Sequence, residues 1–325
     1  MLIVTNFRSF PPSWTASSGE TGDSATAATY RDFVRYRDQP GAVYLVNCNA
    51  RLTFQLAAAA LLPGPHPPLI SADLILRRPA GLLAHLSVPV KRFLLSHVDR
   101  FIHYFRDVRA YQEIFGIGED RSTFVPFKSN LSDRHRIGPQ HEGEYVLCFG
   151  RSLRDFDTFF AAMEGLPCAG AIARPDPAEL RRHSAKFSRP LDALPENVRV
   201  LEDDGSEAAQ LRILGDAKLV VLPILKSSMV ASGISTCLNA MMLGKCVIGS
   251  EGPGMTDIFT QGEILAVPPE DPIALREMIG RAWDDQVLRD STAAAGHAYA
   301  VKAGGERELY QRIIDHLVLN GGSGT

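Results

Sequence analysis

The sequence predicts an α/β protein with two domains built on parallel sheets, and three observations lead to this prediction. Apolar strand-like runs alternate with helical patterns along nearly the whole chain, as in βα units. The chain has 325 residues, more than a single hydrophobic core usually supports. The stretch 219–259 combines two apolar strands, a helix and two glycine-containing turns, which is typical of the ligand-binding edge of an open sheet.

In the first half of the chain, the predicted strands are short apolar runs separated by turn residues. Residues 9–28 are rich in Ser, Thr, Gly and Pro, and we expect a long mobile loop there. Pro89 should break or kink the helix expected over 82–98. The other expected elements are strands at 2–5, 42–46, 69–76, 100–104 and 122–126, and helices at 30–36, 51–62 and 107–115.

A polar stretch at 128–143, with Pro139 and no apolar period, predicts the linker between the domains. We therefore expect one short domain over 1–138, a second over 139–304, and a C-terminal helix with a flexible tail over 305–325. The second domain should contain strands at 145–149, 170–173, 198–201, 219–222 and 246–249, and helices at 156–163, 177–186, 207–214, 236–243 and 272–283.

Composition and charge argue against several classes of protein. A net charge of −3 disfavours a nucleic-acid partner. The five cysteines form no CxxC pair, so we expect reduced, buried thiols in a cytoplasmic protein. The lack of an HExxH motif or carboxylate cluster in the sequence predicts no metal, and no cofactor is expected. Neither a signal peptide nor an apolar run of the ~20 residues that span a bilayer is expected.

The strongest functional signal is the pair of turns within 219–259. The first turn, at 231–236, reads Ala-Ser-Gly-Ile-Ser-Thr and opens a helix. The N-terminus of a helix carries about half a positive charge and unpaired N–H groups, which suit a phosphate. The second turn, Gly252-Pro253-Gly254, follows the next strand. Both turns should lie on one edge of the sheet, so the chain is expected to bind a phosphorylated small molecule.

A second signal is the run Gly-Arg-Ser-Leu-Arg that begins at Gly150, between a strand and a helix. Gly150 permits close approach of a ligand. Arg151 and Arg154 can reach one polyanion, because guanidinium groups bind phosphate through paired donors. The alternative for Arg154 is a surface ion pair with Asp155 or Asp157.

Two polar residues after the turns each have two interpretations. Asn239 lies early in the helix that follows the first turn, where it can bind a ribose hydroxyl or satisfy the local backbone. Asp257 follows the second turn, where it can cap the helix that opens there or contact a sugar.

In their order and spacing, these motifs resemble the C-terminal half of the retaining glycosyltransferases of family four, which have the GT-B fold. The resemblance spans about residues 145–295. It is carried by the strand followed by Gly150-Arg151 and a second basic residue, by Pro223 with a small-residue loop and Ala240-Met241-x-x-Gly244-Lys245, and by Gly252-x-Gly254-x-x-Asp257.

The resemblance implies two Rossmann-like domains whose parallel sheets face a central cleft, with the last helix packing back toward the first domain. It implies that Arg151 and Arg154 hold the donor diphosphate and are the catalytic residues. The family's two glutamates, seven residues apart, are replaced here by Ser232 and Asn239, so the chain is a variant without that pair. Donor contacts are implied for Gly150, Arg151, Arg154, Gly233, Ile234, Ser235, Thr236 and Asn239, and sugar or positioning contacts for Gly254 and Asp257.

The first domain carries weaker signals. His97 and His103 lie near the ends of expected elements, and either imidazole is a candidate for contact with the acceptor. The stretch 77–109 is basic with interleaved Leu and Phe, which suits peripheral contact with an anionic membrane. The alternative, which we favour on sequence alone, is an amphipathic helix with its apolar face in the core.

The predicted function is transfer of a hexose from a nucleotide diphosphate sugar, UDP-linked for example, to a hydroxyl of a glycan, lipid or lipid-linked glycan, with retention. The expected location is the cytoplasm, at the inner face of the membrane if the acceptor is lipid-linked. The alternatives are a non-catalytic GT-B partner subunit, and a nucleotide-sugar epimerase or inverting transferase of the same fold.

Overall fold

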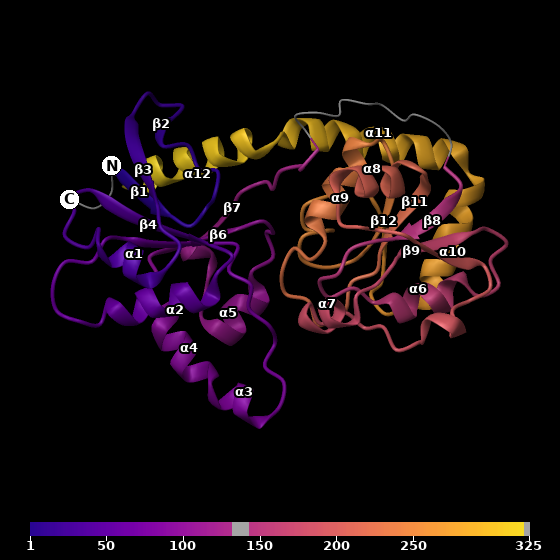
Figure 1. The fold of residues 1–325 in the computed structure, drawn as a ribbon, viewed down its shortest axis with the longest axis horizontal. Helices are drawn as coiled ribbons and strands as arrows, with labels where there is room; N and C mark the ends of the chain where they lie inside the picture. Colours follow the sequence, from indigo (N-terminus) through magenta and orange to yellow (C-terminus); the bar gives the residue numbers. More distant parts are fainter. Residues whose placement is uncertain (132–142, 322–325) are drawn as a thin grey trace. The chain divides into compact units, whose positions relative to one another are not determined.

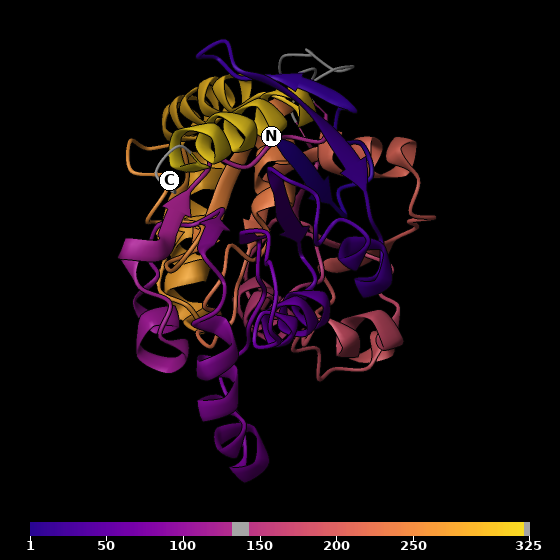
Figure 2. The ribbon, with the colours of Figure 1, turned by 90° about the vertical axis from the view of Figure 1, so that its left-hand side faces the viewer.

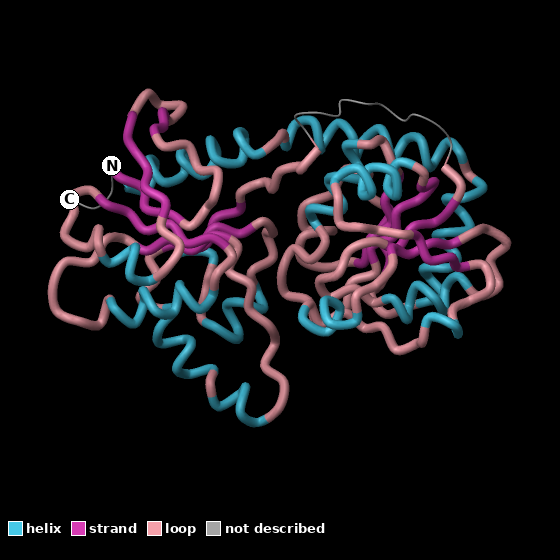
Figure 3. Tube along the Cα trace, in the orientation of Figure 1, coloured by secondary structure: helices cyan, strands magenta, loops and turns pink. Residues whose placement is uncertain are grey.

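The computed structural model describes residues 1–131 and 143–321. The chain forms two compact units, one of Met1–Pro126 with Arg307–Thr325 and the other of Phe127–Glu306 (Figure 1). Each unit is a parallel sheet flanked by helices (Figure 3). The expected boundary between 138 and 139 lies outside the described residues, as does most of the expected linker.

The first unit contains a seven-stranded sheet with the order β2-β3-β1-β4-β5-β6-β7. β2 pairs antiparallel with β3, and the other neighbours pair in parallel. The strands are β1 Leu2–Thr5, β2 Ser13–Thr15, β3 Thr21–Thr26, β4 Ala42–Asn47, β5 Leu69–Ala72, β6 Arg100–His103 and β7 Ser122–Phe124.

The loop predicted over 9–28 is wrong, because this stretch contains β2 and β3. Trp14 on β2 is 5% exposed, and its indole Nε1 donates to the carbonyl oxygen of Asp23 at 3.0 Å. A Cβ at Gly22 would lie 2.3 Å from the Trp14 ring. Gly22 thus leaves room for the buried indole, which holds this hairpin on the edge of the sheet. The amino-acid composition of the hairpin is nevertheless that of a loop.

The helices of the first unit follow the prediction, including the break expected at Pro89. The helix expected over 82–98 is two helices that meet at Ser87, with Pro89 in the first turn of the second. α12 also belongs to this unit, where Tyr310 packs against Phe7 and Phe10 with ring centroids 5.3 and 4.9 Å apart. The helices are α1 Tyr30–Val34, α2 Ala50–Ala59, α3 Leu82–Leu86, α4 Val88–Leu95, α5 Arg109–Phe115, a 3₁₀ turn Glu119–Arg121, and α12 Glu306–Gly321.

The second unit contains a six-stranded parallel sheet with the order β10-β9-β8-β11-β12-β13. Its strands are β8 Tyr145–Cys148, β9 Gly170–Ala173, β10 Val198–Leu201, β11 Ala217–Leu222, β12 Cys246–Ser250 and β13 Leu265–Val267. Its helices are α6 Phe156–Met163, α7 Pro177–Arg182, a 3₁₀ turn Leu191–Ala193, α8 Glu207–Gly215, α9 Ile234–Met242, α10 Pro272–Asp284 and α11 Gln286–Ala303.

The sheet of the second unit is covered on its faces by helices. α9 and α11 pack on β12, while α10 packs on β11 and β13. Every residue of β8 and β12 is buried, which explains their continuous apolar sequences. The sequence predicted neither α11 nor β13: α11 is Ala-rich with little apolar periodicity, and β13 has three residues. In residues 1–131 and 143–321, no helix has the length and hydropathy of a membrane span.

Candidate functional site

The two glycine-containing turns lie side by side at one edge of the second unit's sheet. β11 and β12 pair in parallel, with Leu222 opposite Gly249, and the turns follow their carboxyl ends. A Cβ at Gly254 would lie 2.2 Å from the Cα of Ala231, so the two turns touch through their backbones. This confirms the expectation of a shared edge.

The first turn opens α9 through Gly233, whose φ is +84°. Ile234, Ser235 and Thr236 therefore form the first helical turn, two residues earlier than predicted. Their backbone N–H groups lie at the positive end of the helix, which is the arrangement expected for an anion site.

The guanidinium of Arg154 lies against this turn. Arg154 is completely buried, and among the described residues none accepts a hydrogen bond from its Nε, Nη1 or Nη2. A Cβ at Gly150 would lie 2.5 Å from Nη2, and a Cβ at Gly233 would lie 2.8 Å from the same atom. Both glycines have positive φ, +98° and +84°. Two glycine turns therefore enclose one cation.

The alternative of a surface ion pair for Arg154 is wrong. The carboxylate of Asp155 instead accepts from Thr158, at 3.1 Å from its N–H and 2.7 Å from its Oγ1. Burial lowers the pKa of Arg154 because desolvation disfavours the charged form. A buried charge normally has a counter-charge or a full set of hydrogen bonds, and neither is found for Arg154 among residues 1–131 and 143–321.

Arg151 has a different environment from Arg154. Its side chain is 52% exposed, and Nη1 lies 3.6 Å from Oε2 of Glu179. Leu153, between the two arginines, has a φ of +49°, which turns the chain and sends the two side chains apart. An exposed ion pair of this kind contributes little, so Arg151 can exchange Glu179 for a ligand.

Asn239 is committed to the protein itself. Its Oδ1 accepts from the N–H of Asn130 at 3.0 Å and from Ser129 Oγ at 3.3 Å. Ser235 Oγ accepts from Asn130 Nδ2 at 2.8 Å, and Ser232 Oγ lies 3.0 Å from Ser228 Oγ. These partners of Asn239 lie 109 and 110 residues away in sequence and are not the local backbone that one interpretation expected. Contact with ribose stays a prediction.

Asp257 holds the second turn in shape. Its Oδ1 accepts from the N–H of Gly254 at 2.7 Å, while Thr256 Oγ1 accepts from the N–H of Gly252 at 3.2 Å. The positioning interpretation of Asp257 and Gly254 thus has a structural basis, whereas a contact with sugar stays a prediction.

The same edge carries residues that the sequence did not single out. A cavity of about 110 Å³ opens directly after β11 and β12. This volume suits a fragment of a nucleotide sugar rather than the whole molecule. Lys226 and Glu251 are its exposed charged residues, and their place just after adjacent strands was the available signal. The lining residues are Ile224, Leu225, Lys226, Ser228, Ser250, Glu251, Gly252, Pro253 and Pro269.

The two candidate acceptor histidines lie in unfavourable places. His103 ends β6, but it is 1% exposed, with its ring packed among Phe101, Phe105 and Tyr111. Burial lowers the pKa of His103 to about 4. His97 Nδ1 lies 3.0 Å from the carbonyl oxygen of Phe93. The burial of His103 corrects the expectation that its imidazole faces an acceptor.

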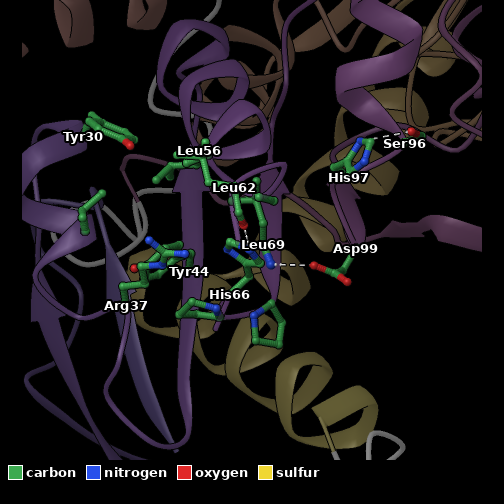
Figure 4. A pocket seen from close by; sticks show the side chains of 15 residues that line it. Tyr30, Arg37, Tyr44, Leu56, Leu62, His66, Leu69, Ser96, His97 and Asp99 are labelled. Atoms are coloured by element: carbon green, nitrogen blue, oxygen red, sulfur yellow. Dashed lines mark hydrogen bonds between the residues drawn. The ribbon is translucent and has the colours of Figure 1, made fainter. Parts of the chain in front are cut away.

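His97 lines a pocket of about 290 Å³ in the first unit (Figure 4). This pocket lies at the amino ends of the strands, since Asp99 precedes β6 and Leu69 begins β5. Its charged groups have structural partners: Asp99 accepts from the N–H of Leu69 at 2.7 Å, and Arg37 donates to the carbonyl oxygen of Pro65 at 2.9 Å. Ligands of parallel sheets bind at the opposite edge, so this pocket is a weak candidate.

At the carboxyl edge of the first sheet, Cys48 and Asp73 form a polar pair that the sequence analysis missed. They follow β4 and β5 with φ of 48° and 49°. Desolvation raises the pKa of Asp73 to about 6, and a hydrogen bond from Cys48 lowers it by less than desolvation raises it. A carboxyl group that titrates there can exchange protons near neutral pH. In the described ranges, no three His, Cys, Asp or Glu side chains gather as a metal site.

Comparison with known proteins identifies the fold. No protein-family model matches the sequence, and no curated protein matches it. Among solved structures, the sucrose-phosphate synthase of Thermosynechococcus elongatus has a TM-score of 0.66 at 16% identity, covering 99% of this chain and 89% of its own.

Two further solved structures are similar over most of their length. HepE of Anabaena, in complex with UDP-glucose, has a TM-score of 0.64 at 12% identity over 98% of this chain and 100% of its own. A glycosyltransferase of Rickettsia africae has a TM-score of 0.64 at 11% identity over 90% and 80%. The chain therefore has the α/β fold of the GT-B glycosyltransferases, with two parallel-sheet units.

Proposed function

We propose that this protein is a nucleotide-sugar-dependent glycosyltransferase whose donor diphosphate binds at the carboxyl edge of β11 and β12. The buried guanidinium of Arg154 carries this proposal, because it has no hydrogen-bond partner in the described part of the chain and lies against two glycine turns and the N-terminus of α9. The solved HepE and sucrose-phosphate synthase structures share the fold, and HepE was solved with UDP-glucose.

Arg151 and Arg154 would stabilise the diphosphate from two sides. Arg151 is exposed and able to bind the phosphate oxygens directly. Arg154 has no exposed surface, so an anion meets its guanidinium after a shift of the turn at Gly150 or Gly233. Glycine permits such a shift with the least steric conflict.

The proposed reaction transfers a hexose with retention. The bond between the anomeric carbon and the diphosphate oxygen breaks, and a bond to the acceptor hydroxyl oxygen forms. The hydroxyl proton passes to the leaving phosphate. Donors aimed at the departing diphosphate stabilise the charge that develops on it, and the reaction needs neither a metal nor a cofactor. The acceptor is the hydroxyl of a glycan, lipid or lipid-linked glycan.

We place the reaction in the cytoplasm, since the five cysteines are free thiols. A lipid or lipid-linked acceptor would bring the enzyme to the inner face of the membrane.

A non-catalytic nucleotide-binding subunit is the second candidate, and one observation favours it. Ser129 and Asn130 donate hydrogen bonds to Oδ1 of Asn239. Asn239 stands at one of the two positions where the family that this chain resembles has a glutamate. Such a subunit would bind a nucleotide sugar without turning it over.

The first test is a thermal-shift panel of UDP-, GDP-, ADP- and TDP-sugars, because a specific ligand raises the melting temperature by mass action. Arg151→Ala should weaken the preferred nucleotide sugar about 10- to 100-fold, the range for a lost charge-assisted hydrogen bond.

Arg199→Ala is the matched control, since Arg199 is 51% exposed and lies 3.4 Å from Glu144, much as Arg151 lies beside Glu179. Equal responses of the two variants would reject the donor site. Binding without transfer to a panel of acceptors would favour the non-catalytic subunit, and the anomeric configuration of the product tests retention.

A further inference from the structure

The segment 74–98 holds exposed apolar side chains that the fold leaves uncovered. Both α3 and α4 lie in it, and α4 buries Leu95. On α3, Leu82 is 76% exposed, Leu83 82% and Leu86 64%. On α4, Val90 is 61% exposed and Phe93 56%.

This finding corrects the sequence interpretation of 77–109. The favoured alternative was an amphipathic helix with its apolar face in the core, yet the leucines of α3 face solvent. The second half of the stretch differs, because β6 lies inside the sheet and Phe101 and Ile102 are fully buried. Only the first half is a surface feature.

The exposed apolar side chains are concentrated in this segment. Of the fourteen large apolar side chains exposed in the described residues, six lie between positions 75 and 93. Large contiguous apolar patches on soluble proteins usually mark an interaction site. Figures 1 and 2 both show α3 at the end of the first unit that lies away from its sheet.

The charge of the segment indicates what it contacts. Residues 74–98 contain Arg77, Arg78, Lys91 and Arg92, with no Asp or Glu. Subtracting these four charges from the net −3 of the chain leaves −7 on the remaining residues. A purely basic segment on an acidic protein is complementary to a uniformly anionic surface, whereas the surface of a protein partner carries charges of both signs.

We propose that α3 and the first turns of α4 dock the first unit on an anionic lipid membrane, with Leu82, Leu83 and Leu86 entering the headgroup boundary. The basic residues precede and follow these leucines in the chain, and in this proposal they hold the lipid headgroups. This contact does not depend on the donor site, which lies in the second unit.

The test is co-sedimentation of the full chain with vesicles of phosphatidylcholine, alone or with about one-third phosphatidylglycerol. Wild type should bind the anionic vesicles, and high salt should weaken the binding. Leu82→Gln with Leu83→Gln should reduce binding at least about tenfold, since two large apolar side chains no longer enter the membrane. Val287→Gln is the control, because Val287 is 79% exposed on α11.

A second pair of variants tests charge. Arg78→Gln with Lys91→Gln should reduce binding to anionic vesicles about 25-fold, at about fivefold for each basic residue. Arg31→Gln, an exposed residue on α1, should leave it unchanged.

Three results would overturn the proposal. In the first, wild type binds neutral and anionic vesicles equally. In the second, the Leu82/Leu83 variant binds anionic vesicles as well as wild type does. In the third, wild type binds no vesicles and forms a dimer in solution, and the Leu82/Leu83 variant is a monomer. The nucleotide thermal shift measured on the same variants separates these failures from failure of the donor site.

Discussion

Arg154→Met should stabilise the ligand-free protein while abolishing its response to nucleotide. The buried guanidinium is without a hydrogen-bond partner among the described residues, and a buried unsatisfied polar group costs roughly 1–3 kcal/mol. Methionine is a flexible apolar side chain that fills the same space. Removing about 2 kcal/mol of this cost should raise the melting temperature of the second unit by about 4–8 °C, given roughly 2–4 °C per kcal/mol for a unit of this size.

The response to ligand should change in the opposite direction. For wild type, a nucleotide diphosphate at about 100 times its Kd adds about 2.7 kcal/mol. The variant should show little of this gain, since the charge that meets the diphosphate is gone. The assay is differential scanning fluorimetry in a buffer free of phosphate and sulfate, with and without UDP, because either anion would mask the unpaired cation.

Arg289→Met is the matched control. Arg289 is 7% exposed in the same unit, but its Nη1 donates to the carbonyl oxygens of Ala282 and Trp283, each at 3.0 Å. Its removal leaves buried acceptors unpaired and should lower the melting temperature. If Arg154→Met behaves like this control, or keeps the full shift with UDP, the inference of a missing anion is refuted.

Two further predictions concern stability. His103 should make the free energy of unfolding pH-dependent, because burial lowers its pKa from 6.5 to about 4. The stability that the neutral imidazole contributes is present above pH 6.5 and is lost as pH falls through 4. The loss is about 3 kcal/mol in all, at 1.36 kcal/mol per pH unit. Urea denaturation between pH 7 and 4 should show a shallower decline for His103→Gln, and parallel curves would contradict this. Gly254→Ala should destabilise the second unit by several kcal/mol, because its φ is +81° and the new Cβ would lie 2.2 Å from the Cα of Ala231. A melting temperature within 1–2 °C of wild type would show that the two turns separate without strain.

The prediction of the fold succeeded where the signal was local. β8, α6 and β9 could be placed from apolar runs and turn residues, and α10 from Asp271, whose Oδ1 accepts from the N–H groups of Ile273 and Ala274. The prediction failed at the hairpin of β2 and β3, because its stability comes from Trp14 packing on Gly22 and from pairing with β1. Neither contact leaves a periodic pattern.

The candidate site divides in the same way. The glycine turns and the start of α9 were readable from the sequence, since positive φ, small residues and a following helix are local requirements. The separation of Arg151 from Arg154 was not readable, because it depends on the positive φ of Leu153. Nor was the role of Asn239, whose partner Asn130 lies 109 residues away.

The sequence by itself determined two parallel-sheet units and a phosphate-suited edge, because strand alternation and helix N-termini depend on near neighbours in the chain. Tertiary structure alone decided which charges lack partners and which apolar side chains lack cover. Arg154 is enclosed by Gly150 and Gly233 from separate turns, and Leu83 stays in solvent on a helix, α3, that buries none of its residues. Burial and pairing are properties of the assembled chain, since they depend on residues distant in sequence that meet only when it folds.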